Sequence, residues 1–200
     1  MRKKMMRDCR FDKSISCFVI FLLTSAMIIS CSDDYSVKPI GQLRLDYPDA
    51  VYKNFESDCP YSFEYSIFSI EKPKEKPCWL ILNYPEMKAN LYLTYYPISG
   101  KDDLAIKIKD SEKLVQNQTV KASYISPREF NFDDHKVYGT LFELGGDSAI
   151  NLQFHATDST RNLLTGSVYF STPPKYDSLQ PAIQYLKKDV VHLIETLKWK

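Results

Sequence analysis

The sequence predicts an α+β fold: a single domain in which an antiparallel β-sheet is packed with an internal helix and a C-terminal helix. Apolar and polar residues alternate in several short segments between residues 41 and 171, as in strands with one buried face. Two longer segments, residues 102–118 and 177–197, instead repeat their apolar residues with the period of an amphipathic helix. Gly145-Gly146-Asp147-Ser148 is typical of a hairpin turn, which makes the neighbouring strands antiparallel.

An export signal precedes this domain. Six Lys and Arg residues are followed by a mostly apolar run, residues 15–29, which is short compared with the roughly 20 residues that a membrane-spanning helix needs. The tetrad Ile28-Ile29-Ser30-Cys31 resembles the lipobox of bacterial lipoproteins, in which the Cys is acylated and becomes the mature N-terminus. The alternative is an ordinary signal peptide or a short signal anchor in which Cys31 is incidental.

These features divide the chain into three parts. Residues 1–30 are the predicted lipoprotein signal peptide, residues 31–40 the acylated N-terminus and tether, and residues 41–200 the single α+β domain. Cys31 is the predicted lipidation site, and several acyl chains, palmitate among them, hold a protein far more firmly than one. The protein is therefore expected to be attached to a membrane without spanning it.

The balance of charge changes when the leader is removed. The precursor has a formal charge of +1, whereas the 170 residues from Cys31 onward hold 20 Lys and Arg against 23 Asp and Glu, a charge of −3. Basic residues are not clustered as they are in nucleic-acid-binding proteins. We therefore expect no nucleic-acid partner.

Cysteine usage agrees with export. Cys9 and Cys17 lie in the leader and Cys31 is assigned to the lipid, so Cys59 and Cys78 remain. In an oxidising compartment these two are expected to form a disulfide, which stabilises by about 3 kcal/mol when it closes a loop of about 20 residues. The alternative is a pair of buried free thiols. Neither Cys has a second Cys or His at the spacing of a zinc site.

The first half of the domain is predicted to contain four strands. Alternation marks residues 41–47 and 61–67, and the segment 72–77 (KPKEKP) is a charged turn with two prolines. Residues 78–84 (CWLILNY) are more uniformly apolar, so this strand is expected to be central in the sheet. A fourth strand follows at residues 89–95.

The internal helix separates these strands from the next group. Residues 102–118 lack Pro and Gly and begin with two Asp residues, which the helix dipole favours; their apolar positions are Leu104, Ile108, Leu114 and Val115. Strands are expected at residues 135–144, 149–156 and 162–171, with a turn at 157–161.

A second helix closes the chain. Asp177 is the predicted N-cap, with Gln180 three residues later as in a capping box, and Pro181 is placed in the first turn. One apolar stripe runs along this helix and is expected to pack on the sheet: Leu179, Ile183, Leu186, Val190, Ile194 and Leu197.

No catalytic constellation is visible. His155 and His192 are interpreted as solvated or cap-like, Asp133-Asp134-His135 as a polar loop, and Ser148 lacks a nucleophile-elbow motif. We therefore predict no catalytic residue, metal site, cofactor or small-molecule substrate. The 14 Tyr residues would suit a glycan- or protein-binding surface if exposed, although most are expected to pack beside the core.

From residue 35 to residue 200 the chain resembles the gliding-motility lipoproteins of the GldD family. The resemblance rests on the lipobox and on five blocks: DCPYSFEY (58–65), PCWL (77–80), KVYG (136–139), TDSTR (157–161) and ETLKWK (195–200). It implies an envelope lipoprotein required for gliding and for the associated type IX protein secretion, without enzymatic activity. The order of strands and helices is also similar to that of PsbP/Mog1-type domains, which is a fold-level analogy only.

Two functions from different classes follow. The first is a non-catalytic assembly factor that is anchored at Cys31, preferably to the outer membrane, and contacts other gliding and secretion proteins of the envelope. The second is a peptidoglycan- or glycan-binding module, or a hydrolase with an unrecognised site.

Overall fold

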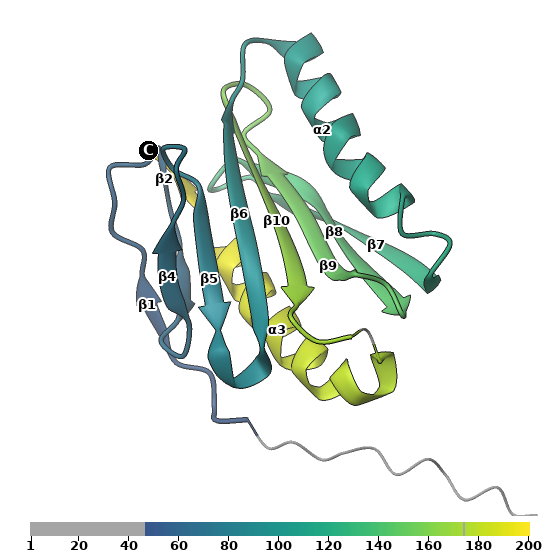
Figure 1. Ribbon diagram of the computed structural model, residues 1–200. Helices are drawn as coiled ribbons and strands as arrows, with labels where there is room; N and C mark the ends of the chain where they lie inside the picture. The colour runs from purple at the N-terminus through teal and green to yellow at the C-terminus, as the bar shows by residue number, and fades with distance from the viewer. Residues whose placement is uncertain (1–46, 174) are drawn as a thin grey trace, which may run out of the picture. The chain divides into compact units, whose positions relative to one another are not determined.

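The structure, a computed structural model, describes residues 47–173 and 175–200. In this part of the chain an antiparallel sheet of seven strands forms the centre of the domain (Figure 1). In spatial order its strands are β4 (Ile70–Pro73), β5 (Leu80–Tyr84), β6 (Ala89–Pro97), β10 (Asn162–Phe170), β9 (Ile150–Thr157), β8 (Val137–Gly146) and β7 (Ala122–Phe132).

One helix packs on each face of the sheet. Helix α3 (Tyr176–Thr196) lies behind it in Figure 1, and α2 (Lys101–Gln116) lies in front of the β9 side. Because neighbouring residues of a strand point to opposite faces, Leu91 and Leu93 of β6 face α3, whereas Tyr92 and Thr94 face the other way. The predicted α+β fold with two packed helices is thus confirmed.

Short elements complete the domain. The 3-10 turn η1 (Pro85–Met87) connects β5 to β6. Two small ribbons lie outside the main sheet, and in each the two strands are antiparallel. They are β1 (Tyr52–Asn54) with β3 (Glu64–Ser66), and β2 (Tyr61–Ser62) with β11 (Lys198–Trp199).

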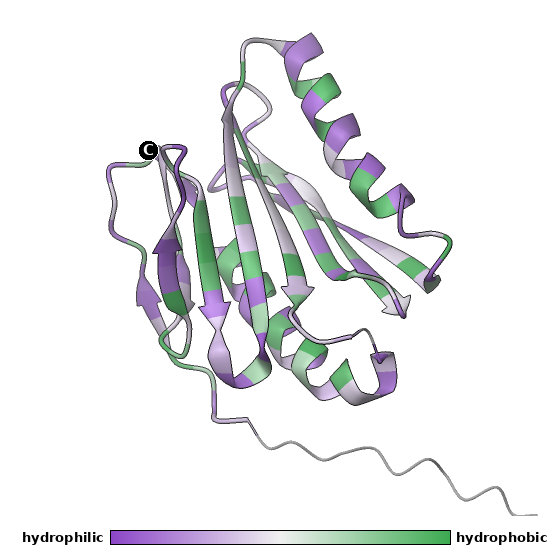
Figure 2. Cartoon of the chain, in the orientation of Figure 1, coloured by the Kyte–Doolittle hydropathy of each residue, from purple (hydrophilic) through white to green (hydrophobic). Residues whose placement is uncertain are grey.

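The main core lies between the sheet and α3. The predicted stripe on α3 is buried here, with Ile183, Leu186 and Val190 almost fully enclosed. Gly166 of β10 lies opposite Phe154 of β9, and the ring of Phe154 occupies the space that a side chain at Gly166 would need. Figure 2 shows the corresponding green positions on the strands and on α3.

Several predicted elements differ in the structure. Strand β5 is the second strand from one edge rather than a central one, and its residues Ile81 and Asn83 are only partly buried; β10 holds the central position. The predicted strand at 61–67 is divided between β2 and β3. Strand β2 pairs with β11 and β3 pairs with β1, so each half belongs to a different small ribbon and neither belongs to the main sheet. Its alternation still buries Tyr61, Phe63 and Tyr65.

The start of α3 also differs from the prediction. Its N-cap is Lys175 instead of Asp177, and the side chain of Asp147 in the β8–β9 turn accepts a hydrogen bond from the Tyr176 backbone N–H at 3.3 Å. Pro181 consequently lies in the second turn of the helix. The predicted strand at residues 41–47 falls outside the described residues except for Tyr47, which is not in a strand.

None of the helices within residues 47–173 and 175–200 has both the length and the apolar character required to cross a bilayer.

Candidate binding surface

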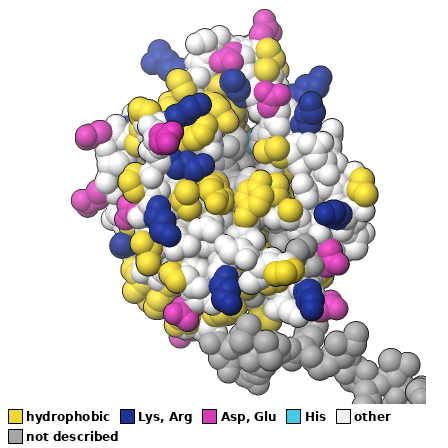
Figure 3. Space-filling model, in the orientation of Figure 1, with side chains coloured by type: hydrophobic (Ala, Val, Ile, Leu, Met, Phe, Trp, Pro, Cys, Tyr) yellow, Lys and Arg dark blue, Asp and Glu magenta, His cyan; other side chains and the backbone are white. Residues whose placement is uncertain are grey.

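A groove lies on the sheet face opposite α3. Residues of β6, β10 and α2 line this groove of about 500 Å³. We call it the tyrosine groove; its floor and walls include Tyr92, Thr94, Tyr96, Thr165, Ser167 and Tyr169. In Figure 3, which shows this face, hydrophobic side chains in the middle are bordered by Lys and Arg side chains.

Strand alternation and register build the groove. The side chains that β6 turns away from α3 are Tyr92, Thr94 and Tyr96, and antiparallel pairing places Ser167 beside Tyr92 and Thr165 beside Thr94. Aromatic rings therefore alternate with hydroxyls across two neighbouring strands. Burial raises the pKa of Tyr96 and of Tyr169, with a further rise for Tyr96 from nearby Asp110, so both phenols stay protonated and able to donate.

The rings form two edge-to-face pairs. The centroids of Tyr92 and Tyr169 are 5.5 Å apart, and those of Trp79 and Tyr96 are 6.0 Å apart. Edge-to-face packing of this kind holds each ring in place and leaves part of its surface accessible. Trp79 is fixed further by its indole N–H, which donates to the Tyr95 carbonyl at 2.9 Å.

Lysine side chains lie over these rings. The Lys74 ammonium is 4.7 Å from the Tyr92 centroid, Lys76 is 4.4 Å from Trp79, and Lys107 of α2 is 5.4 Å from Tyr96. Exposed cation–π contacts contribute only about 0.5–1 kcal/mol each, so the ammonium groups are free to turn toward a ligand. An adjoining pocket beneath α2 includes one carboxylate, Asp110. The groove is therefore aromatic, rich in hydroxyls and mainly basic.

A disulfide holds the loop that supplies Lys74, Lys76 and Trp79. Cys59 is bonded to Cys78, and their Cα atoms are 5.4 Å apart. The Tyr61 hydroxyl donates to the Cys78 carbonyl at 2.7 Å, and the Lys74 backbone N–H donates to the Trp79 carbonyl at 3.1 Å. The two cysteines singled out in the sequence thus position one rim of the groove.

The three His residues and Ser148, which were candidates from the sequence, do not come together. Cys31 lies outside the described residues. His135 is exposed in the β7–β8 turn, which fits the polar loop that was expected there. The Ser148 hydroxyl is buried and donates to the Ile150 carbonyl at 2.7 Å, which gives it a structural role in the β8–β9 turn.

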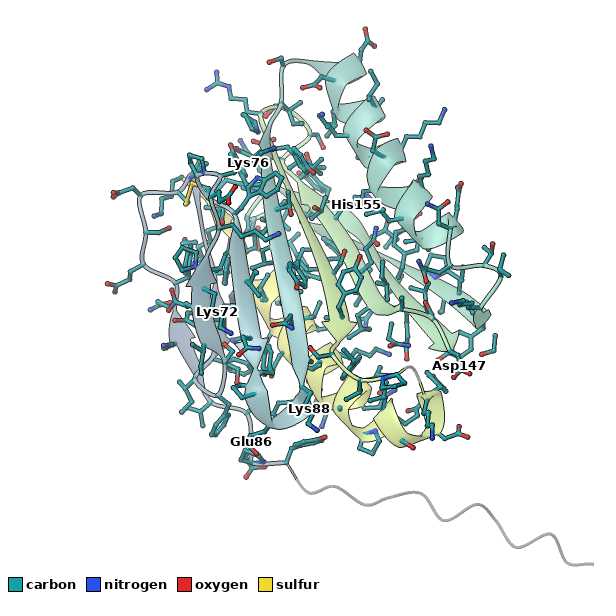
Figure 4. The ribbon with its side chains drawn as sticks, in the orientation of Figure 1. Lys72, Lys76, Glu86, Lys88, Asp147 and His155 are labelled. Atoms are coloured by element: carbon teal, nitrogen blue, oxygen red, sulfur yellow. A yellow bond between two sulfur atoms is a disulfide. The ribbon has the colours of Figure 1, made fainter. Side chains whose placement is uncertain are left out.

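The interpretation of His155 as solvated or cap-like is wrong. Its side chain is only 5% exposed and lies between the sheet and α2 (Figure 4). Burial lowers the pKa of its imidazole to about 4. Asn151 and Gln153, on the same face of β9, are buried as well, because α2 covers this polar face; the Gln153 amide donates to the backbone carbonyl of Ser111 in α2.

His192 belongs to a polar network that the sequence did not reveal. Its Nε2 is 2.8 Å from a Glu64 carboxylate oxygen, and its ring stacks on Tyr52 with centroids 3.6 Å apart. The Tyr52 hydroxyl donates at 3.0 Å to Asp189, which is 3% exposed. Burial raises the pKa of Asp189, although hydroxyl donors, first that of Tyr52, oppose the rise. This network joins the β1–β3 ribbon to α3.

One signal could have revealed Asp189. It lies three residues after Leu186 and directly before Val190, so the helical period places a carboxylate inside the apolar stripe. Such a buried acid requires partners from another element. Within residues 47–173 and 175–200, no cluster of three or more His, Cys, Asp and Glu side chains could hold a metal ion.

Comparison with known proteins agrees with the resemblance seen in the sequence. The sequence matches no curated protein. The family model described as gliding motility lipoprotein GldD matches residues 32–199. Because this match spans most of the chain, the protein belongs to the GldD family of gliding motility lipoproteins.

Proposed function

We propose that this protein is a non-catalytic, lipid-anchored envelope component that supports gliding motility and the associated type IX secretion through protein contacts. The observation that carries the proposal is the family match over residues 32–199, which includes almost the whole described domain. Membership of a lipoprotein family implies a location at a membrane of the cell envelope. We assign the protein to the outer membrane, with Cys31 as the acylated residue.

The anchor is tested by metabolic labelling with a fatty-acid analogue. Label is expected in the wild-type protein and absent from Cys31→Ala, because the lipobox ends at this Cys. Cys31→Ser is a matched variant that changes a single atom and should also lose the label. Label that persists in either variant would contradict the assignment of Cys31.

The tyrosine groove is the surface that we assign to the protein contact. Tyr and Trp supply large contact areas at low cost in conformational entropy and are enriched among residues that dominate binding energy. Lys74, Lys76 and Lys107 surround the groove, so it suits an acidic segment of the partner. The disulfide-bonded loop gives this surface a fixed shape before binding, which lowers the entropy cost of association.

A glycan is the second candidate ligand. The same rings offer faces on which a sugar stacks, and Asn90, Thr165 and Ser167 offer amide and hydroxyl groups beside them. The two candidates are separated by capture of partners from solubilised envelope and by co-sedimentation with peptidoglycan. Protein capture without co-sedimentation supports the assembly function, and the opposite result supports the glycan-binding module.

The groove variant for these assays is Tyr92→Ala combined with Tyr169→Ala. It removes one perpendicular ring pair on the open face and leaves the α3 core untouched. Tyr124→Ala is the matched control, since Tyr124 is an exposed Tyr on edge strand β7. Partner capture is expected to fall at least tenfold in the double variant and to persist in the control.

The enzyme alternative has one specific candidate, the Glu64–His192 pair. In our account this pair is structural, so His192→Gln should retain gliding and secretion near the wild-type level at normal abundance. Loss of both activities in a normally abundant His192→Gln protein would favour a hydrolase, with this imidazole as its first candidate residue.

A further inference from the structure

Large apolar side chains are exposed together at one end of the domain. They are Val51 (49% exposed), Ile67 (45%), Phe68 (40%) and Ile70 (53%), which we call the apolar tip. The Ile67 N–H donates to the Val51 carbonyl at 3.0 Å, and the Ser69 N–H donates to the Ser66 carbonyl at 3.1 Å. The turn between β3 and β4 therefore presents Ile67 and Phe68, with Val51 beside it and Ile70 at the start of β4, and this region is green in Figure 2.

The chain enters the domain beside this tip. The ring of Tyr47, the first described residue, is 5.2 Å from that of Tyr185 on α3. Helix α3 packs against β3, whose last residue, Ser66, directly precedes Ile67. The β5–β6 connection, with Glu86 and Lys88, lies at the same end (Figure 4). The segment from the lipid anchor therefore arrives at the apolar end.

The length of that segment confines the domain. Sixteen residues, 32–47, separate Cys31 from this entry point, inclusive of Tyr47. A chain of this length spans no more than about 55 Å even when fully extended. Tyr47 is consequently held within this distance of the bilayer and the neighbouring tip is at a high local concentration there, so a weak intrinsic affinity for the surface is sufficient for contact.

We propose that the apolar tip inserts into the interface of the bilayer that holds the Cys31 lipid. The proposal rests on the acylation of Cys31 proposed above. Charges around the tip are of both signs: Lys53 pairs with Glu71 at 3.8 Å, and Glu86 accompanies Lys88. The attraction is therefore apolar rather than directed at anionic headgroups, and the tip adds an apolar contact to an attachment that several acyl chains already make stable.

Insertion orients the groove. In the β4–β5 pair Ile70 lies opposite Asn83, whereas Pro73 lies opposite Leu80, so the loop that carries Lys76 and Trp79 is at the other end of the strands. Figure 4 shows Lys76 at the end away from Glu86 and Lys88. With the tip on the membrane, this basic rim of the tyrosine groove points away from the bilayer, where a partner has access to it.

The test uses the acylated protein, purified from the envelope in detergent and reconstituted into phosphatidylcholine vesicles with brominated acyl chains. Phe68→Trp places a fluorescent reporter in the tip, and Ile106→Trp, on the exposed side of α2, is the matched control. The two native Trp residues contribute the same background fluorescence in both variants. We expect the emission of the reporter in the Phe68→Trp variant to be blue-shifted and quenched at least twofold by bromine, and that of the control to be unchanged.

Two results would overturn the proposal: an unquenched reporter in acylated Phe68→Trp protein, or shielding that occurs only after envelope proteins are added, which would assign the tip to a protein partner. Intact mass separates these from failure of the anchor, because a missing acyl mass contradicts the assignment of Cys31 itself. Replacement of Ile67, Phe68 and Ile70 by Ser tests the same contact without a reporter. On vesicles, the triple variant should be cleaved at the tip as fast as it is in detergent. The wild-type protein on vesicles should be cleaved there at least tenfold more slowly.

Discussion

The two faces of the central sheet differ in what holds them to their helices. On the α3 face, Ile183, Leu186 and Val190 pack on apolar strand residues and exclude water. On the α2 face, the only buried residues of the helix are Ser111 and Val115, and Ser111 accepts hydrogen bonds from the Gln153 amide. The first face supplies the free energy of folding, whereas the second leaves rings, hydroxyls and ammonium groups available for binding.

This division has a physical cause. Apolar burial contributes in proportion to area and does not depend on direction, so one well-packed helix can stabilise the sheet. Polar groups must each find a partner, and α2 provides partners only where it lies over β9. Beyond α2, the strands β6 and β10 keep an uncovered polar face, which is the tyrosine groove.

The largest expected effect is a difference in stability between variants of the two helices. Leu186→Ala on α3 should lower the free energy of unfolding by about 2–5 kcal/mol, because it leaves a cavity in the core. Leu114→Ala is the matched control on α2, where this Leu is exposed, and it should change stability by less than about 0.5 kcal/mol. Urea denaturation followed by circular dichroism measures both. Equal losses would show that α2 and α3 contribute alike.

Reduction of the Cys59–Cys78 disulfide should have a somewhat smaller effect on stability. A cross-link that closes a loop of about 20 residues stabilises by about 3 kcal/mol. Because the bond holds the loop with Lys74 and Trp79, Cys59→Ser with Cys78→Ser should also weaken binding at the groove. Thiol titration of protein purified without reductant should detect no free thiol at these positions. Two reactive thiols would refute the bridge.

The third effect depends on pH and tests burial under α2. The folded-state pKa of His155 is about 4, below its ordinary value of 6.5, so the folded protein binds fewer protons than the unfolded chain between these values. Stability supplied by this group is complete above pH 6.5 and is lost as the pH falls to 4, by about 3 kcal/mol.

His155→Gln should remove that pH-dependent part. The stability difference between wild type and variant is expected to shrink from pH 7 to pH 4, as measured by urea denaturation at each pH. His135→Gln, which removes an exposed imidazole, is the control. A difference that stays constant with pH would mean that water reaches His155.

Sequence patterns correctly predicted the elements that bury a single face against the rest of the domain. The alternation at residues 89–95 predicted β6, and the apolar stripe predicted α3, because each pattern directly records one buried face. The pattern in β9 was equally clear, but alternation does not show that a second helix covers the polar side, which is why His155 was misinterpreted. Strand β7 was missed because an edge strand tolerates Pro127, Arg128 and Glu129.

The candidate site was less predictable. Tyr92 and Tyr169 lie on the polar phases of strands separated by more than 60 residues, and only the pairing of β6 with β10 brings their rings together. The Lys side chains of the groove come from the β4–β5 loop and from α2, and no local pattern connects these segments. Sequence spacing records local geometry, whereas this groove is created by strand register.

The central claim is that the open face performs the function and the α3 face maintains the fold. The most direct measurement is complementation of a strain that lacks the gene, with protein abundance, colony spreading and secretion recorded for Tyr92→Ala/Tyr169→Ala and for Leu186→Ala. We predict that the groove variant accumulates at the wild-type level but fails in spreading and secretion, and that Leu186→Ala loses activity in proportion to its abundance. A groove variant that spreads and secretes normally would contradict the account.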